Sequence, residues 1–372
     1  MINKKIRVIV SMSGGVDSSV AALLMKRKGY DVLGCFMKNW SDSKTDSSSC
    51  KWKEEREMAI KIASKLGIPL ITLDFEKEYK RKVVDEMFNS YRKGMTPNPD
   101  IDCNEKIKFP LLIKTAKNLG ADYVVTGHYA RIKKTEKGYE LYRAKDETKD
   151  QSYFLYRLTQ KELKYILFPI GEFTKKKVRE IARKNGFENF NRKGTVGICF
   201  IGKINLKKFL QKRIKQKIGK IFDPDGRVIG YHDGVYYYTI GQRIGPRFGI
   251  DIDRGKGKEV KRWYVAAKNV RKNEIIAAPE GHKILYKNKV LIKDPNWILG
   301  VPSKNNKTRV FSRIRHVGEL LPSTLYYKNV KNCFEVILDK AITGISEGQA
   351  IVLYEGKKVL GGGVIKFDEG FD

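Results

Sequence analysis

The segment that most constrains the fold of this chain is Ser13-Gly14-Gly15-Val16-Asp17-Ser18-Ser19. The apolar residues 6–12 before it are typical of a buried parallel strand, and residues 20–28 after it have a helical pattern that ends before Gly29. Two glycines allow a tight turn and a close approach to a ligand, while the following helix offers free N–H groups and its positive dipole end. The segment therefore predicts a phosphate-binding turn; a Ser/Gly-rich turn without a ligand is the alternative.

Two common nucleotide-binding patterns are absent from this turn. It has no Gly-Lys-Ser/Thr, which supplies the lysine of a Walker loop, and no Gly-x-Gly-x-x-Gly, which binds dinucleotides. The turn is therefore neither a kinase-type loop nor a nicotinamide-binding loop.

The spacing of the apolar runs predicts an α/β doubly wound parallel sheet. Further strands are expected at 31–37, 70–74 and 123–126, and helices at 54–66 and 106–118. Ligands of such sheets bind at the carboxyl ends of the strands, where Met37 and Gly127 are expected beside the phosphate turn. A thioether such as that of Met37 could pack on an adenine ring or simply fill the core.

The pattern changes after about residue 205. A basic helix is expected at 206–218, and later Gly-bounded stretches are typical of small antiparallel sheets or barrels: 234–240, 263–267, 289–292, 309–314, 333–338, 350–354 and 358–364. We expect three units, namely a catalytic α/β domain at 1–205, a small central domain with the basic helix and β structure at 206–280, and a C-terminal β-barrel-like domain at 281–372.

The 372 residues carry a net charge of +33. Such a charge suits a polyanionic partner such as RNA, although lysines scattered over a solvated surface would give the same sum. No apolar run reaches the roughly 18 residues of a membrane span. The apolar run at the N-terminus is too short for a signal peptide. We therefore expect a cytoplasmic protein without a membrane partner.

The cysteine pattern favours chemistry over a structural framework. No Cys-x-x-Cys pair occurs among the five cysteines and only four histidines are present, which argues against structural zinc. An odd number of cysteines also argues against a disulfide framework. Cys35 lies within an apolar strand and is expected in the core, whereas Cys50 and Cys333 have no surrounding signal.

Two cysteines are candidates for catalysis. Cys103 lies in a predicted loop just before the helix at 106–118, where a helix N-terminus lowers the pKa of a thiol. Asp100 is a candidate base for the thiol proton, although helix capping explains it equally well. Cys199 lies between Gly197 and Gly202, which favours a turned backbone that presents the sulfur; a buried structural cysteine is equally compatible.

The pattern Ser-Gly-Gly-x-Asp-Ser resembles the pyrophosphate loop of the ATP pyrophosphatases, which cleave ATP between its α and β phosphates and adenylate an acceptor. The resemblance implies ATP and Mg²⁺ as cofactors, with Mg²⁺ held by the phosphates and Asp17 and not by a dedicated protein cage. The ATP-binding positions that it implies are Ser11, Met12, Ser13, Gly14, Gly15, Val16, Asp17, Ser18, Met37 and Gly127.

Nearly the whole chain resembles one branch of these enzymes, the tRNA-specific 2-thiouridylases. The motifs that carry this resemblance are Ser13 to Ser19, Asn98-Pro99-Asp100 with Cys103-Asn104, Thr126-Gly127-His128-Tyr129, Lys149-Asp150-Gln151, Gly197-Ile198-Cys199-Phe200, Tyr238-Thr239-Ile240-Gly241-Gln242 and Leu360-Gly361-Gly362-Gly363. The sequence departs from the family around Cys199, because Lys193-Gly194-Thr195-Val196 and Lys203 replace segments that commonly carry acidic residues.

The resemblance implies a tRNA-uridine 2-sulfurtransferase. ATP adenylates the C2 oxygen of the wobble uridine, and sulfur from a persulfide on Cys199 replaces that oxygen, with Cys103 as partner and Asp100 also in the catalytic set. AMP and pyrophosphate are released, and Cys103 and Cys199 end as a transient disulfide. The persulfide sulfur comes from a donor protein, either a cysteine desulfurase or a sulfur-relay protein.

The implied partner is tRNA, with the Lys, Glu and Gln types expected. A base within a loop must be splayed out to be modified. The tRNA-binding positions implied by the resemblance are Asn98, Pro99 and Asp100 at the target base, and His128, Lys149, Asp150, Gln151, Arg313, Ile314 and Gln349 elsewhere.

The residues alone leave other functions open. Another ATP pyrophosphatase could thiolate a different tRNA position or form lysidine, and the latter reaction needs no cysteine pair. A small-molecule adenylating ligase could use the same loop, although the basic, aromatic-rich C-terminal half fits it poorly. A non-enzymatic RNA-binding protein could carry the same charge, but the intact phosphate turn argues against it.

Overall fold

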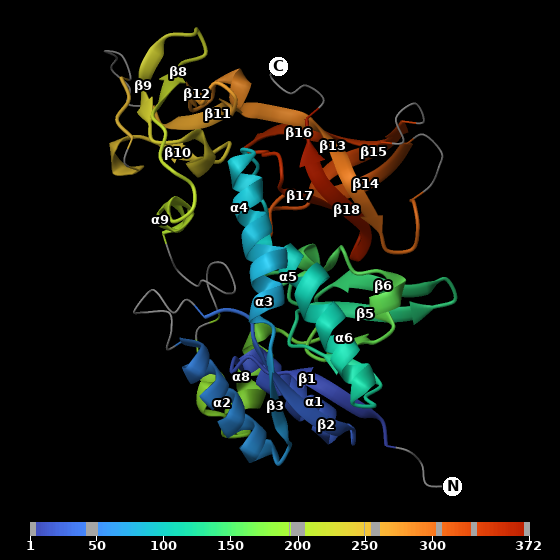
Figure 1. Ribbon diagram of the computed structural model, residues 1–372. Coiled ribbons are helices and arrows are strands. Elements are labelled where there is room, and N and C mark those ends of the chain that lie inside the picture. Colours follow the sequence, from blue (N-terminus) through green and yellow to red (C-terminus); the bar gives the residue numbers. More distant parts are fainter. Residues whose placement is uncertain are drawn as a thin grey trace.

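The computed structural model describes residues 5–41, 51–192, 194, 205–248, 250–253, 261–302, 307–328 and 333–367 (Figure 1). Cys199 lies outside the described residues, as do Lys203 and Cys50. Within the described ranges, an α/β region, a small β region and a C-terminal barrel follow one another along the chain, coloured blue to green, yellow, and orange to red in Figure 1.

The α/β region is built on a parallel sheet, as the sequence predicts. Its strand order is β3-β2-β1-β4-β7. The strands are β1 (Arg7–Ser11), β2 (Asp31–Lys38), β3 (Leu70–Asp74), β4 (Tyr123–Val125) and β7 (Ile166–Leu167). The first four agree closely with the predicted positions, whereas the two-residue β7 has too short an apolar run to be recognised from the sequence.

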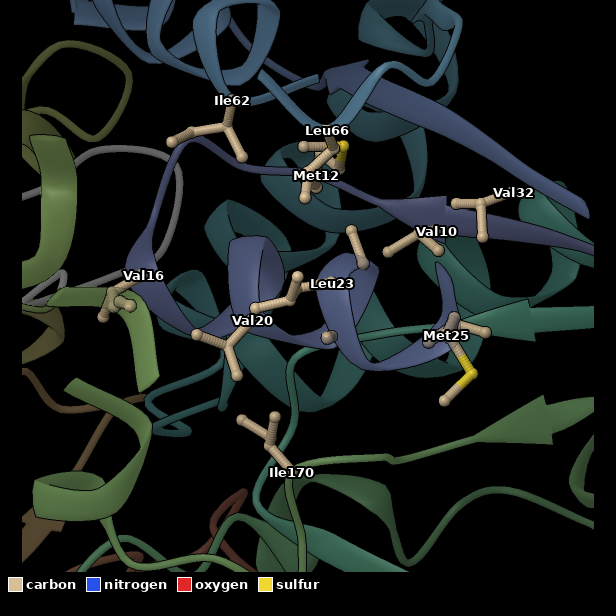
Figure 2. Packing of buried hydrophobic residues seen from close by; sticks show 14 of the residues in the cluster. Val10, Met12, Val16, Val20, Leu23, Met25, Val32, Ile62, Leu66 and Ile170 are labelled. Atoms are coloured by element: carbon tan, nitrogen blue, oxygen red, sulfur yellow. The ribbon is translucent and has the colours of Figure 1, made fainter. Parts of the chain in front are cut away.

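Helices cover both faces of this sheet because successive strand residues point to opposite sides. Val8 and Val10 pack against α1 (Val16–Arg27), α2 (Lys51–Leu66) and α8 (Lys175–Lys184), while Ile9 packs against α6 (Phe109–Asn118). Figure 2 shows Val10 beside the helix that carries Leu23, with Met12 close to Leu66. Each such side chain, when fully buried, stabilises the fold by about 1.5–3 kcal/mol before conformational entropy is counted. Helix α1 begins at Val16, earlier than its predicted start at residue 20.

A helical column rises from the sheet towards the two β regions (Figure 1). It comprises α3 (Glu76–Tyr79), a π turn (Lys80–Val84) and α4 (Asp85–Arg92). After a short connection, α5 (Pro99–Cys103) continues through a second π turn (Asn104–Lys108) into α6. The prediction of a loop around Cys103 is therefore wrong: the Asn98 side chain accepts hydrogen bonds from Asp100 N and Ile101 N, which starts the helix at Pro99.

The central region is a sheet with strand order β10-β11-β12-β8-β9. Its strands are β8 (Gly219–Phe222), β9 (Val228–His232), β10 (Arg243–Ile244), β11 (Trp263–Asn269) and β12 (Glu274–Pro279). The predicted helix 206–218 is only α9 (Leu206–Gln211), because the Tyr237 hydroxyl bonds to the Ile214 carbonyl and Lys217 N bonds to Asp233 O. The predicted strand 234–240 is instead a 3₁₀ turn (Val235–Tyr237), which follows Gly234 at φ +146°.

The C-terminal region is a closed barrel of six strands. Their order is β13-β16-β15-β14-β17-β18, and pairing of β13 with β18 closes the circle. The strands are β13 (Tyr286–Trp297), β14 (Lys307–Arg313), β15 (Leu321–Lys328), β16 (Cys333–Thr343), β17 (Ala350–Glu355) and β18 (Lys358–Lys366). Strand β13 runs through Asp294-Pro295, where its register against β18 shifts between Lys293 and Asn296. A bulge at this proline accommodates its missing N–H group.

A hairpin from the α/β region extends the barrel sheet. Its strands are β5 (Ala130–Thr135) and β6 (Gly138–Arg143), and β6 pairs with β18 through Tyr142 opposite Lys358 and Leu141 opposite Val359. The α/β region and the barrel thus share one hydrogen-bonded sheet of eight strands. Among the described helices, none has both the length and the apolar character needed to cross a bilayer.

Candidate active site

The phosphate turn connects β1 to α1 at the carboxyl edge of the parallel sheet. Gly14 has φ +70°, and a Cβ added to it would lie 2.3 Å from the Glu55 carbonyl oxygen, so only glycine fits. Gly15 is the N-cap of α1 and provides no side-chain cap. The first N–H groups of a helix lack partners within the helix, so these donors are available to an anion.

Serine hydroxyls hold the turn in shape. The Ser18 hydroxyl accepts from Ser13 N at 3.1 Å and donates to Gly15 O at 3.0 Å. The Ser19 hydroxyl donates to the same carbonyl at 3.0 Å. Asn189 braces the turn from outside, because its side-chain nitrogen lies 2.9 Å from both Gly14 O and the Ser19 hydroxyl. Sequence reasoning missed Asn189, which lies in no recognisable motif.

Asp17 lies in the first turn of α1 and is held by two residues that sequence reasoning also missed. Lys175 Nζ contacts both carboxylate oxygens at 2.6 Å. The Tyr129 hydroxyl donates to Asp17 Oδ1 at 2.8 Å. Burial and the adjacent Asp17 charge raise the pKa of Tyr129, so its hydroxyl stays protonated as a donor. Tyr129 is part of the motif Thr126-Gly127-His128-Tyr129, whereas no sequence pattern around Lys175 predicts its role.

The other predicted ATP-binding positions gather at the same edge. A Cβ on Gly127 would lie 2.6 Å from Ser18 N, so glycine is needed where β4 ends against α1. The Ser11 hydroxyl lies 3.6 Å from the Met37 sulfur at the end of β2. The Met12 side chain is buried in the core, which leaves its backbone as the part nearest the turn. Val16 is likewise a core residue at the start of α1.

Helix α5 brings Cys103 to this edge of the sheet. Ile101 of α5 packs in the same cluster as Ile9 of β1, with Met37 against it. Cys103 is 2% exposed and belongs to a neighbouring cluster that Met37 also contacts. Asp100 and Asn98 are partly buried on the first turn of α5, while Pro99 is buried. Met37, at the carboxyl end of β2, connects the two parts: it packs against the cluster that contains Cys103, and its sulfur lies 3.6 Å from the hydroxyl of Ser11, just before the phosphate turn. By contrast Cys35 is fully buried, which confirms its predicted place in the core and raises its pKa to about 12.

The connection before α5 is where all three regions meet. Thr96 N donates to Glu347 O of the barrel at 2.9 Å, and the Thr96 hydroxyl lies 3.1 Å from that of Thr239 in the central region. Lys268 Nζ donates to Gly94 O and to Tyr238 O, both at 2.7 Å. Desolvation lowers the pKa of Lys268 to about 8. We call this group of contacts around Gly94 and Thr96 the three-way junction.

Gln349 borders the three-way junction. It follows Gly348, on which a Cβ would lie 2.9 Å from Thr96 N. Its side-chain oxygen is buried and has no hydrogen-bond partner among the described residues. A buried amide oxygen without a partner is a candidate for a ligand contact.

Asp150 and Arg313 form a buried ion pair between the α/β region and the barrel. Arg313 Nη1 lies 2.7 Å from Asp150 Oδ2, and Arg143 approaches the same oxygen at 3.5 Å. Asp150 also accepts from Ala144 N and from Ser152. Asp150, Arg313 and the neighbouring Ile314 are at most 5% exposed, so little of their side-chain surface is accessible to RNA. Their contacts with tRNA stay predictions.

The remaining predicted tRNA positions differ in accessibility. Lys149 is exposed. Gln151 uses its side-chain oxygen to accept from Tyr129 N at 2.9 Å. His128 is buried between the rings of Phe109 and Phe168, and its Nδ1 lies 2.6 Å from the Thr126 hydroxyl. Desolvation and, secondarily, Lys108 hold the pKa of His128 well below its usual value, so the ring is neutral.

No group of three or more His, Cys, Asp or Glu side chains that could hold a metal ion occurs in the described ranges. Asp17 is the acidic side chain at the phosphate turn, and a single carboxylate beside phosphate oxygens fits a Mg²⁺ ion that keeps much of its water.

Comparisons with known proteins agree with this architecture. Family models match in succession: a tRNA methyl transferase HUP domain at residues 6–203, a tRNA methyl transferase PRC-barrel domain at 207–279 and an aminomethyltransferase beta-barrel domain at 287–365. The tRNA-specific 2-thiouridylase MnmA of Lactobacillus helveticus is 43% identical over 98% of this chain and 96% of its own. The protein of the same name from Bacillus subtilis is 41% identical over 96% and 94%. A solved structure, the U34-tRNA thiolase NcsA of Methanococcus maripaludis, is 14% identical over 56% of this chain and 63% of its own, at a TM-score of 0.35 that is too low to carry an argument.

The fold and the phosphate turn define a nucleotide-binding α/β enzyme with two appended β regions. The chain belongs to the family of tRNA-specific 2-thiouridylases.

Proposed function

We propose that this chain makes 2-thiouridine at the wobble position of tRNA in an ATP-dependent reaction. The observation that carries the proposal is that Met37, at the carboxyl end of β2, packs against the cluster that contains Cys103 and lies 3.6 Å from Ser11, just before the phosphate turn. Neither an adenylating ligase nor an RNA-binding module needs a buried cysteine on a helix beside the nucleotide site. The names of the relatives, tRNA-specific 2-thiouridylases, supply the substrate class.

The first step is adenylation. The glycines and N–H groups of the turn would hold the phosphates of ATP, with Met37 and Gly127 nearby for the rest of the nucleotide. Mg²⁺, held by the phosphates and Asp17, would neutralise charge on the leaving pyrophosphate. The C2 oxygen of uridine attacks the α phosphorus, pyrophosphate leaves, and a poor oxygen leaving group becomes AMP.

The second step is sulfur transfer. A persulfide on Cys199 supplies the sulfur, either by attacking C2 directly or as hydrosulfide that Cys103 releases by attacking the persulfide. In both cases the C2–O bond breaks and AMP leaves. The outer persulfide sulfur is reduced to the sulfide level as it is transferred, and Cys103 and Cys199 are left oxidised as a disulfide. Asp100, on the first turn of α5, is the candidate base for the Cys103 proton. After a thiol reductant has reopened the disulfide, a cysteine desulfurase or a sulfur-relay protein would reload Cys199.

tRNA would enter over the three-way junction. Asn98, Pro99 and Asp100 would meet the splayed target base, Gln349 offers its unpaired oxygen beside them, and exposed Lys149 would contact a phosphate. We propose a catalytic domain at 1–205, a central domain at 206–280 and a tRNA-contacting barrel at 281–372, working in the cytoplasm on tRNAs of the Lys, Glu and Gln types. The net charge of +33 supports a polyanionic substrate.

The test is nucleoside mass spectrometry of tRNA after incubation with the protein, ATP, Mg²⁺ and a persulfide donor, namely a cysteine desulfurase with free cysteine. We expect 2-thiouridine at the wobble position, lost in Cys103→Ser and Cys199→Ser and retained in the core variant Cys35→Ser. If thiolation persists in both catalytic-cysteine variants, the sulfur-transfer assignment is wrong. Pyrophosphate release without a thiolated nucleoside would leave an adenylating enzyme with another acceptor.

A further inference from the structure

The phosphate turn lacks the lysine that a Walker loop carries within its own sequence. A cation is nevertheless present at the turn, since Lys175 of α8 lies 158 positions from Asp17 and contacts both of its carboxylate oxygens at 2.6 Å. The question is whether this lysine serves Asp17 alone or the ligand of the turn.

The surroundings of Lys175 hold its backbone in place, while its flexible side chain can contact more than one anionic group. Lys175 is the first residue of α8, which Thr174 caps, and its N–H donates to Asp146 Oδ2 at 2.8 Å. The ammonium lies 5.7 Å from the centre of the Tyr129 ring. Four flexible methylene groups therefore separate a fixed backbone from a charge positioned beside the turn.

Asp17 cannot keep this partner and also serve a cation bound with ATP. Both oxygens of Asp17 are occupied, one by Lys175 and the other by Lys175 together with Tyr129. The side chains of Lys175 and Asp17 are 15% and 30% exposed, so the pair is partly desolvated and an ammonium released from Asp17 would need another anion close by. Phosphate oxygens at the N-terminus of α1 would provide that anion.

We propose that Lys175 is the phosphate-binding cation of this site, supplied by α8 in place of the missing Walker lysine. Without nucleotide it is stored on Asp17. When ATP binds, the ammonium moves to the β and γ phosphate oxygens and frees the Asp17 carboxylate. This inference rests on the proposed ATP-binding function and adds to it a residue and an exchange of partners.

The test measures equilibrium binding by calorimetry in the absence of tRNA, with ATP, pyrophosphate and AMP as probes. We expect Lys175→Met to weaken ATP and pyrophosphate binding at least tenfold and to leave AMP binding nearly unchanged, because AMP lacks the β and γ phosphates. Lys176→Met, which alters the exposed neighbour, is the matched control and should bind all three as the wild type does.

A second variant separates the proposal from a merely structural ion pair. In Asp17→Asn the lysine loses its competing partner, so pyrophosphate binding without Mg²⁺ should strengthen. Loss of the Asp17 charge alone also favours an anion, so the deciding comparison adds Lys175→Met to Asp17→Asn. If Lys175 only neutralises Asp17, this second change will not weaken Mg²⁺-free pyrophosphate binding, and that result overturns the proposal. Failure of the wild type to bind ATP would instead refute the proposed function itself.

Discussion

The two ends of the candidate site are built in different ways. At the phosphate end, the hydrogen bonds that shape the turn join residues between Ser13 and Ser19. At the other end, the three-way junction where tRNA is proposed to bind, Thr96 before α5 contacts Thr239 and Ser346, which lie 143 and 250 positions away. The phosphate end is therefore a local motif that a few distant residues support, whereas the three-way junction exists only when all three regions are assembled. Changes in the barrel should disturb sulfur transfer before they disturb nucleotide binding.

The largest effect is expected from Asp150→Ala, which breaks one of the links between the α/β region and the barrel. Removing one partner of a buried ion pair leaves a buried charge without compensation, so the free energy of unfolding should fall by about 3–5 kcal/mol. Urea denaturation measures it. The adjacent exposed variant Lys149→Ala should keep its stability and instead weaken tRNA binding with a shallower salt dependence. If Asp150→Ala keeps its stability and loses tRNA binding, Asp150 acts at the RNA and not between the regions.

Gly127→Ala tests the phosphate end. Its Cβ would lie 2.6 Å from Ser18 N and 2.7 Å from the Asp17 carbonyl carbon, and backbone atoms cannot yield as a flexible side chain can. We expect a loss of roughly 1–3 kcal/mol in the free energy of unfolding together with weaker ATP binding. Gly15→Ala is the control for stability, because its Cβ would meet the Ser13 hydroxyl at an ordinary 3.4 Å. Equal stability of the two variants would contradict the close approach of β4 to α1.

Lys268→Met tests whether the three-way junction can be disturbed without affecting the phosphate end. The carbonyls of Gly94 and Tyr238 lose their shared donor, so α5 should be held less firmly. We expect the turnover rate of thiolation to fall about tenfold, or about 1.4 kcal/mol, with little change in ATP affinity. Single-turnover kinetics and calorimetry measure the two quantities, and exposed Lys272→Met is the control. A parallel loss of ATP affinity would mean that the two ends are not independent.

The last prediction concerns a change of conditions at His128, whose folded-state pKa lies below the ordinary value of 6.5. Because the unfolded chain binds a proton that the buried ring does not, stability should fall as the pH drops below 6.5, by at most about 1.4 kcal/mol per pH unit. Urea denaturation between pH 7 and about pH 5 should show this loss in the wild type and a shallower one in His128→Gln. Identical pH profiles of the wild type and His128→Gln would contradict this, because they would mean that protonation of His128 does not lower the free energy of unfolding.

Several features followed from local patterns alone. Strands β1, β2 and β3 and helix α2 appear close to their predicted positions because each buries a continuous or periodic apolar run. The errors arose where a local signal was missed or was ambiguous. The helix at Pro99 depends on a cap from Asn98, and the turn at Val235–Tyr237 uses apolar residues that would equally suit a strand. Lys175 and Asn189 contact the phosphate turn although they lie far from it in the sequence, so the motif itself could not predict them.

The sequence predicted the cysteine pair Cys103 and Cys199 through its resemblance to the family, and Cys199 lies outside the described residues. By itself, the sequence determined the phosphate turn and the parallel sheet that carries it. These follow from residue type and short-range spacing, since glycine conformation, helix dipoles and strand periodicity act over a few residues. The tertiary structure alone decided which distant residues complete the site. It pairs β6 with β18, seats Thr96 among three regions and holds Asp17 between Tyr129 and Lys175. The physical reason is that these contacts form only after non-local packing has met the entropic cost of bringing distant segments together.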